Sequence, residues 1–189
     1  MTSTRFDVVG LGNAIVDILS RADDAFLEKW GIQKDAMNLI DEPRAHALTA
    51  EAKNPVVTSG GSGANTIAGI ASFGGNAAYI GKTANDDLGR QFRAELTSTG
   101  VPFATHPLDS GPATARCIIF VNDDGARSMN TFLGASVLFS KDDVDEDVVR
   151  AGKILYLEGY LFDKDDAKTA FVHASEIAKA AGRLVSLTL

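Results

Sequence analysis

Apolar and polar residues alternate along the chain in two rhythms, which predict where strands and helices lie. Short apolar runs ending in glycine or polar residues predict strands at 6–12, 76–81, 153–160 and 183–189. Apolar residues three or four positions apart predict helices at 21–32, 41–52, 85–100, 141–151 and 165–181, and residues 55–75 form a strand, a glycine loop and a helix. Because alternating strands and helices are typical of a parallel sheet covered on both faces, we expect an α/β core.

One segment breaks this alternation. Residues 114–134 contain two strand-like runs joined at 122–125 by the sequence Asn-Asp-Asp-Gly. Aspartate and glycine tolerate the positive φ angles of a tight turn, so this segment predicts a hairpin. A hairpin does not belong in a parallel core, and we expect it to form part of a separate small sheet.

The last predicted strand, at 183–189, is followed by no further element. Parallel strands normally lead into a loop and a helix, and the edge of such a sheet is normally covered. We therefore expect the chain to be the front part of a longer protein.

Composition narrows the possible partners. Acidic residues outnumber basic ones by 25 to 18, so the net charge of −7 argues against nucleic acid or an anionic membrane as a partner. The single cysteine, Cys117, excludes an internal disulfide and favours a cytoplasmic location, while the start of the chain lacks a signal-peptide pattern. His46, His106 and His173 have no ligand spacing with each other or with Cys117, so we expect no metal site.

Two glycine motifs resemble nucleotide-binding loops, but the first fails on residue type and the second on spacing. In Gly10-Leu-Gly12, the third small residue of a dinucleotide fingerprint is replaced by Ile15, which leaves an NAD-dependent dehydrogenase as a distant alternative. Between Gly75 and Gly81 there are five residues where a P-loop has four, and those residues are strand-like. We therefore interpret Lys82 as a surface or loop lysine.

Short polar side chains lie beside predicted strand ends, where open α/β sheets bind ligands. Asn13 and Asp17 follow the first strand, and Gly60, Gly61 and Asn65 follow another. A carboxylate can accept hydrogen bonds from two neighbouring hydroxyls, and an amide can both donate and accept. Asn13 and Asp17 could instead be a turn residue and a helix cap. Together, the five residues favour a pocket that binds a polyhydroxylated molecule.

With these residues in place, the sequence resembles the ribokinase-type (PfkB) family of sugar and nucleoside kinases. The resemblance covers essentially the whole chain, and it rests on the segments "GNAIVD", "GGSGANTIAGIASFGG", "GKTANDDLG", "TARCIIFVNDDGARSMNTFLGA" and "YLEGYL". The stretches "SMNTFLGAS" and "VSLTL" are more similar to the adenosine-kinase-like branch than to the ribokinase branch.

This resemblance implies a three-layer ribokinase-like α/β fold with a small β-sheet lid. It implies that residues 1–189 are the N-terminal part of the kinase domain, truncated within the core sheet, with the C-terminal ATP-binding part absent. The lid pieces are expected at about 14–42 and 106–135. They include the short strand-like segment at 36–40 and the hairpin.

The resemblance also assigns roles to individual residues. It implies that Asp17 holds sugar hydroxyls and that the di-glycine bends as the lid closes. Tyr160 matches one residue of an aromatic pair that packs near the base in adenosine kinases, but Leu161, at the second position, departs from that pair. Arg127 matches a lid arginine that can approach the transferred phosphate, or it is a solvated hairpin residue. The expected substrate-binding residues are Asn13, Asp17, Met37, Leu39, Gly60, Gly61, Ser62, Asn65, Leu133, Ala135 and Tyr160.

The implied reaction transfers the γ-phosphate of ATP, with Mg²⁺, to a primary hydroxyl of a sugar or nucleoside. In the family the catalytic aspartate lies in a Gly-Ala-Gly-Asp stretch, and neither this stretch nor Asn-x-x-Glu occurs here. We therefore expect no catalytic residue in this chain and an inactive fragment. A catalytically inactive sugar- or nucleoside-binding module is the alternative. The expected partner is a small molecule, with the protein a monomer or homodimer.

Overall fold

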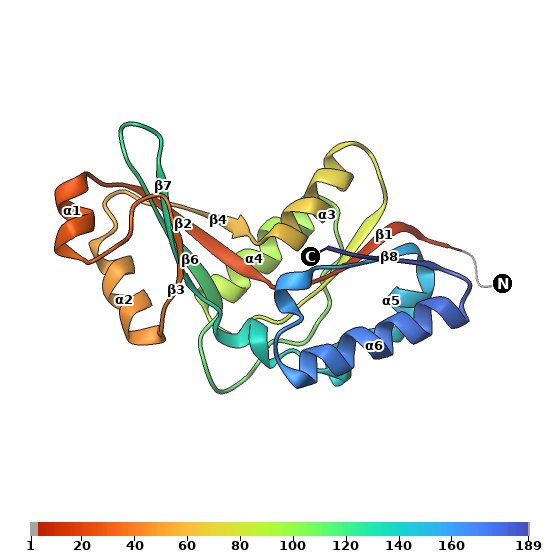
Figure 1. The fold of residues 1–189 in the computed structure, drawn as a ribbon. Helices are drawn as coiled ribbons and strands as arrows, with labels where there is room; N and C mark the ends of the chain where they lie inside the picture. The colour runs from red at the N-terminus through yellow and green to blue at the C-terminus, as the bar shows by residue number, and fades with distance from the viewer. Residues whose placement is uncertain (1–3, 189) are drawn as a thin grey trace.

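The computed structural model describes residues 4–188 and arranges them around two β-sheets (Figure 1). The first sheet has four parallel strands in the order β5 (Ala77–Ile80), β1 (Phe6–Leu11), β8 (Gly152–Leu157) and β9 (Leu184–Leu187). The second has five strands in the order β3 (Met37–Leu39), β7 (Arg127–Phe132), β6 (Ala115–Val121), β2 (Ile15–Arg21) and β4 (Val56–Gly60). In Figure 1 the second sheet extends to the left, away from the first.

Six α-helices and three short 3₁₀-helices complete the described part of the chain. The α-helices are α1 (Asp24–Lys29), α2 (Glu42–Glu51), α3 (Ser62–Ser72), α4 (Asp87–Ser98), α5 (Glu146–Ala151) and α6 (Asp165–Ala180). The 3₁₀-helices are η1 (Gly134–Leu138), η2 (Lys141–Asp143) and η3 (Gly159–Leu161). An aspartate caps α2 as predicted, since the Asp41 carboxylate accepts a hydrogen bond from the backbone N–H of Arg44 at 2.9 Å.

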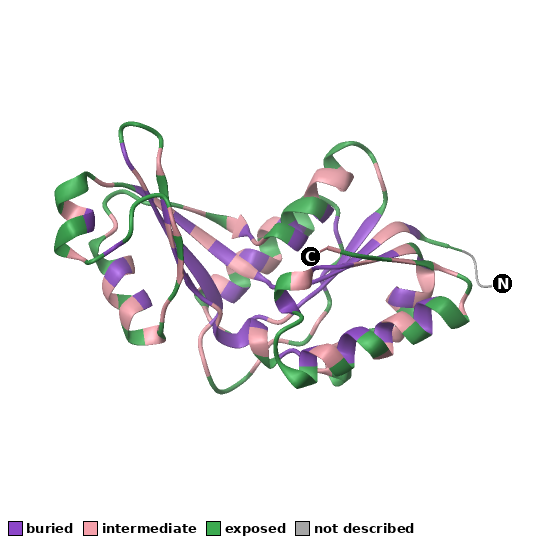
Figure 2. Ribbon diagram, viewed as in Figure 1, coloured by how far each residue is buried: buried purple, intermediate pink, exposed green. Residues whose placement is uncertain are grey.

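Helices cover both faces of the first sheet, which confirms the three layers expected. Successive side chains of a strand point to opposite faces. In β5, Ala78 and Ile80 pack into a core with α5 and α6, whereas Ala77 and Tyr79 pack into another with α3 and α4. Buried residues accordingly concentrate along the strands and on the inner sides of the helices (Figure 2).

The second sheet has helices on one face only. Ile118 and Phe120 on β6 pack against Leu27 of α1 and Leu48 of α2. On the same side, α4 packs against β4 and β2. Within residues 4–188 no helix covers the other face of the sheet, so that face can meet a ligand.

Strand β2 is missing from the sequence-based prediction, which treated Asp17 either as a strand-end ligand or as a helix cap. Residues 15–21 instead form a strand in the interior of the second sheet, so the helix-cap interpretation is wrong. Strand β4 also differs from prediction, because it pairs antiparallel with β2 and does not join the core sheet. The second sheet thus includes a strand from outside the two predicted lid pieces.

Two predicted elements differ from those in the structure: one helix is divided in two, and one strand ends early. The helix expected at 141–151 is split into η2 and α5, because Ser140 and Asp145 each begin a new cap. The strand expected at 153–160 ends at Leu157 and is followed by η3.

No helix within residues 4–188 combines the length and the apolar character needed to cross a bilayer.

Candidate functional site

A cavity of about 530 Å³ lies against the helix-free face of the second sheet and reaches the ends of β1 and β8. Ten of the residues singled out in the sequence line it. They are Asn13, Asp17, Met37, Leu39, Gly61, Ser62, Asn65, Arg127, Leu133 and Tyr160. The sequence reasoning did not assign the other lining residues to a binding site. They are Ile15, Cys117, Ile119, Met129, Thr131, Glu158 and Asp163.

Strand register builds one wall of this cavity. Residues paired across neighbouring strands point to the same face of a sheet. Asp17 on β2 pairs with Cys117 on β6, which pairs with Thr131 on β7, which in turn pairs with Leu39 on β3. On its other side Asp17 pairs with Thr58 on β4, so the sheet sets a single carboxylate in an otherwise uncharged row.

The di-glycine turn after β4 closes around the two polar residues near β1. A Cβ atom on Gly60 would lie 2.4 Å from the Asp17 carboxyl group, and one on Gly61 would lie 2.7 Å from the Asn13 carbonyl oxygen. Gly61 also has a φ of 89°, which side chains rarely allow. Both positions need glycine because the backbone passes this close to Asn13 and Asp17.

Glu158, at the end of β8, ties the polar part of the site together. Its Oε2 accepts hydrogen bonds from the backbone N and the Nδ2 of Asn13, at 2.7 and 3.2 Å. Its Oε1 accepts from the Gly63 backbone N at 2.8 Å and from the Ser62 hydroxyl. Gly61, at the start of α3, offers no side-chain cap, so a carboxylate from a distant strand takes that role.

These bonds fix the orientation of the Asn13 amide. Nδ2 donates to Glu158, so Oδ1 is left as an acceptor, and it has no hydrogen-bond partner among the described residues. Asn13 is only 1% exposed. A buried acceptor without a donor is costly, and the cavity beside it is where a ligand can supply that donor.

Asp17 and Arg127 set the electrostatics of the cavity. Burial raises the pKa of the Asp17 carboxyl above its usual value, and the positive charge of Arg127 opposes this rise. Arg127 itself is exposed at the start of β7. A partly desolvated carboxylate facing one cation is suited to binding hydroxyl groups.

Two residues expected at the site, Ala135 and Gly60, lie outside the cavity lining. Ala135 is fully buried, its backbone N–H donates to the Ala113 carbonyl, and it is not among the residues that line this cavity. Gly60 does not line the cavity and acts through its contact with Asp17. Leu161 packs in the core with α6, while its neighbour Tyr160 is 73% exposed at the cavity rim.

Neither of the two glycine motifs has the structure that a nucleotide-binding loop requires. Gly10 and Gly12 lead from β1 into strand β2, whereas a dinucleotide fingerprint needs a helix there. Lys82 does lie in a loop but is not a surface residue. Its side chain is 14% exposed and pairs with Asp143, which is 8% exposed.

Within residues 4–188, no three histidine, cysteine, aspartate or glutamate side chains gather as metal ligands. Cys117 is buried in mid-strand on β6.

A family model described as pfkB family carbohydrate kinase matches residues 25–188 of the chain. Among curated proteins, probable fructokinase-4 from Arabidopsis thaliana is 30% identical over 139 residues, which are 72% of this chain and 43% of that protein. Fructokinase-1 from Zea mays is 30% identical over the same share of each chain.

Solved structures match over nearly the whole chain. A probable sugar kinase from Rhizobium etli CFN 42 is 49% identical with a TM-score of 0.91, covering 98% of this chain and 56% of that one. An adenosine kinase from Sinorhizobium meliloti is 52% identical with a TM-score of 0.90, covering 98% and 57%. These matches confirm the expected fold class and family resemblance, and the chain spans little more than half of either structure.

Proposed function

The chain belongs to the pfkB family of carbohydrate kinases, and from this premise we propose that residues 1–189 form the acceptor-binding part of an ATP-dependent kinase. The acceptor is a sugar or nucleoside, and the reaction phosphorylates its primary hydroxyl. The chain spans 43% of the curated fructokinase and 56–57% of the two solved relatives, so the remainder of such an enzyme is not represented in it.

The observation that carries this proposal is the unpartnered Oδ1 of Asn13, buried beside the cavity that Asp17 also lines. Both groups accept hydrogen bonds and neither can donate one when Asp17 is ionised. A molecule that presents several hydroxyl donors satisfies both at once. Ser62 and Asn65 supply further polar groups at the same end of the cavity.

The residues of this chain position the acceptor. Asp17 accepts hydrogen bonds from two neighbouring hydroxyls, and Asn13 accepts from a third group. Glu158 holds Asn13 and the start of α3 in place through four hydrogen bonds. Arg127 is a cation that lines the cavity, so we assign it the contact with the transferred phosphate. Its positive charge already acts on Asp17.

ATP and Mg²⁺ belong to the proposed reaction, in which ATP supplies the phosphoryl group. The residues of this chain do not fit a site for MgATP. Residues 4–188 contain no cluster of metal-binding side chains, and the sequence has no Gly-Ala-Gly-Asp stretch. We therefore expect the 189-residue protein to bind the acceptor without phosphorylating it.

The test is acceptor binding by the 189-residue chain and its Asp17→Asn variant, measured by isothermal titration calorimetry with adenosine and fructose. Losing the charged partner of the hydroxyls is expected to cost about 2–4 kcal/mol of binding free energy. Asp109→Asn, an exposed position remote from the cavity lining, is the matched control and should bind like the parent.

Two results would contradict the proposal. If neither ligand binds the parent chain, the acceptor site is not where we place it. If the 189-residue chain transfers phosphate from MgATP to either ligand in a coupled assay, the catalytic group is present after all.

A further inference from the structure

The chain passes between the two sheets at four places. They are residues 12–14 after β1, Gly61 after β4, residues 113–114 before β6 and residues 133–143 after β7. Asn13, Gly61 and Leu133, which line the cavity, each belong to one of these crossings. The shape of the cavity therefore depends on how the crossings are held.

Residues 81–86, which follow β5, contact three of the four crossings, and we call them the junction loop. The first contact is with the turn after β1. A Cβ atom on Gly81 would lie 2.7 Å from the Gly12 carbonyl oxygen, a distance that only glycine allows. The junction loop therefore packs directly against the turn that carries Asn13.

The second contact is with the segment that enters β6. Thr114 is fully buried, and its hydroxyl accepts a hydrogen bond from the Ala84 backbone N–H at 2.9 Å. The Asp86 carboxylate accepts from the Thr114 backbone N–H at 2.8 Å and from its hydroxyl at 2.6 Å. The next residue, Ala115, pairs with Ile15, which lines the cavity. The junction loop thus fixes β6 beside the acceptor site.

The third contact is with the segment that leaves β7. Lys82 forms an ion pair with Asp143, and their side chains are 14% and 8% exposed. The other oxygen of Asp143 accepts from the backbone N–H and the hydroxyl of Ser140, at 2.9 and 3.2 Å. Removing two charges from water is costly, and apolar residues could stabilise the fold as well. What this ion pair adds is a defined position for the segment.

Resting on the proposed function, we propose that Lys82 is a positioning residue for the acceptor. Through its ion pair with Asp143, the junction loop holds the second sheet where one acceptor reaches both Asn13 and the wall formed by β6 and β7. Lys82 does not itself line the cavity. When the ion pair is broken, the second sheet samples other positions, and the apparent affinity falls with the fraction of molecules that can bind.

Calorimetric titration of the 189-residue chain with adenosine and with fructose tests this. Lys82→Met keeps much of the length of the side chain and removes its charge, and it is expected to weaken binding of each ligand that the parent binds by about tenfold. Asp143→Asn should have the same effect. The double variant Lys82→Met/Asp143→Asn should bind no more weakly than either single variant, because the two side chains act as one unit.

A loss of stability alone has to be separated from a loss of positioning. Ile177→Ala is the control, because Ile177 is buried near the end of α6 and outside the cavity lining. Truncating it leaves a void in the core, so the free energy of unfolding falls while the affinity of the folded protein stays like that of the parent. Hydrogen exchange should quicken at β6 and β7 relative to β5 in Lys82→Met and not in Ile177→Ala.

Thr114→Val provides a second measurement that does not depend on Lys82→Met folding. It removes the hydroxyl that binds Ala84 and Asp86, leaves the ion pair in place, and should also weaken binding.

Lys82→Met and Thr114→Val both binding like the parent would overturn the inference and leave the proposed function standing. The same holds if Ile177→Ala weakens binding as much as Lys82→Met does. Absence of binding of both ligands by the parent removes the proposed function and this inference together.

Discussion

At the scale of single residues, Glu158 shows what the sequence could and could not predict. Asn13 and Asp17 were identified because each is a short polar residue beside an apolar strand. Glu158 has the same signal, an acid directly after the run "KILYL", but its partners lie 145 and 95 positions earlier in the chain. Its role depends on two parallel strands, β1 and β8, lying side by side, which spacing along the chain does not reveal.

Arg127 tunes the charge state of Asp17, which gives a pH-dependent prediction. Removing the cation in Arg127→Gln leaves only burial acting on the carboxyl, so the pKa of Asp17 rises further. If binding requires the ionised carboxylate, the acidic limb of the affinity–pH profile moves to higher pH. Calorimetric titrations across pH 4 to pH 8 measure this, with Arg90→Gln on exposed α4 as the control.

The raised pKa of Asp17 also determines how the stability of the fold changes with pH. A carboxyl whose pKa is raised by folding favours the neutral form, so its contribution to the folded state is fully present below its unfolded pKa and is lost as pH rises through the folded value. Arg127→Gln raises the folded pKa of Asp17 further, so it should increase the stability that is lost as pH rises. An unchanged affinity profile and an unchanged stability profile would show that the two side chains do not interact.

At the scale of elements, β2 and β4 are where sequence reasoning failed. The segment "IVDILSR" alternates partly buried and buried residues along its first six positions, as a strand does, but the glycine motif before it drew attention to a strand–helix turn. Strand β4 was predicted, yet its sheet was not, because the hydrophobic pattern of a strand does not identify its neighbour. By contrast, α2, α4 and α6 were predicted well because helical periodicity is a local property of the sequence.

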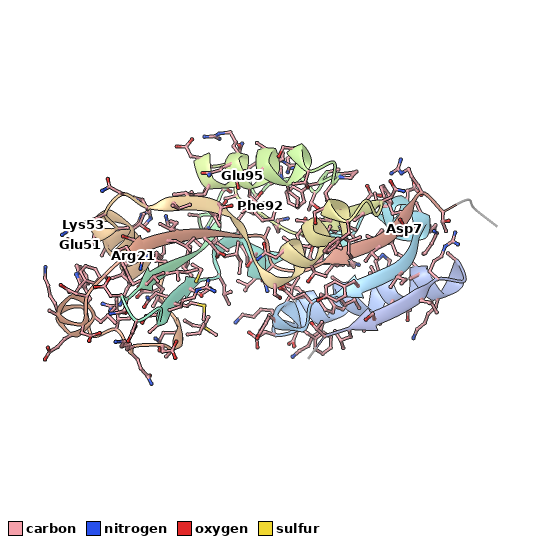
Figure 3. The ribbon with its side chains drawn as sticks, turned by 90° about the horizontal axis from the view of Figure 1, so that it is seen from above. Asp7, Arg21, Glu51, Lys53, Phe92 and Glu95 are labelled. Carbon is pink, nitrogen blue, oxygen red and sulfur yellow. The ribbon has the colours of Figure 1, made fainter. Side chains whose placement is uncertain are left out.

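Helix α4 holds the edge of the second sheet, and this contact carries a prediction. Gln91 donates to the Val57 carbonyl at 3.1 Å, and the Glu95 carboxylate accepts from the Ser59 backbone N–H. Glu95→Ala frees that edge group and is expected to lower the free energy of unfolding by about 1 kcal/mol at pH 7. Urea unfolding measures this, with Glu51→Ala at the end of α2 as the control (both residues are labelled in Figure 3).

The pH dependence of the Glu95 contact has a fixed sign. Burial acts to raise the pKa of Glu95, but hydrogen bonds from Gln91, Ser59 and Thr58 outweigh it and lower the value. A lowered pKa means that the stabilisation is present above the unfolded value and is lost as pH falls through the folded one. Parent and Glu95→Ala should therefore converge in stability in acid; a constant difference at all pH values would contradict this account.

At the scale of the whole molecule, the cavity is walled by the second sheet and by the segments that follow β1 and β8 of the first, so a bound acceptor should stabilise both sheets. Adenosine at one hundred times its Kd is expected to raise the free energy of unfolding by about 2.7 kcal/mol. Hydrogen exchange should slow at β2 and β6 in the second sheet and also at the start of α3 in the core. Protection confined to one sheet would mean that the ligand does not bridge them.

The α/β class, the existence of a separate small sheet and the family could all be predicted from the sequence, since each rests on composition, periodicity or contiguous motifs. The course of the chain between the sheets could not. Lys82 illustrates this: its local sequence predicts a surface or loop lysine, yet it pairs with Asp143, 61 positions later, in the segment that leads from the second sheet back to the core.

The carboxylate of Glu158 has one more consequence. Glycine-rich helix starts commonly attract phosphate, but the amide of Gly63 and the hydroxyl of Ser62 at the start of α3 are already bound to a negative group of the protein itself. An incoming phosphoryl group is repelled from that corner and has to reach the acceptor from another direction. In the kinase that we propose, a phosphorylated acceptor would be an anion beside the carboxyl groups of Asp17 and Glu158, so this end of the site favours the neutral alcohol over the phosphorylated product.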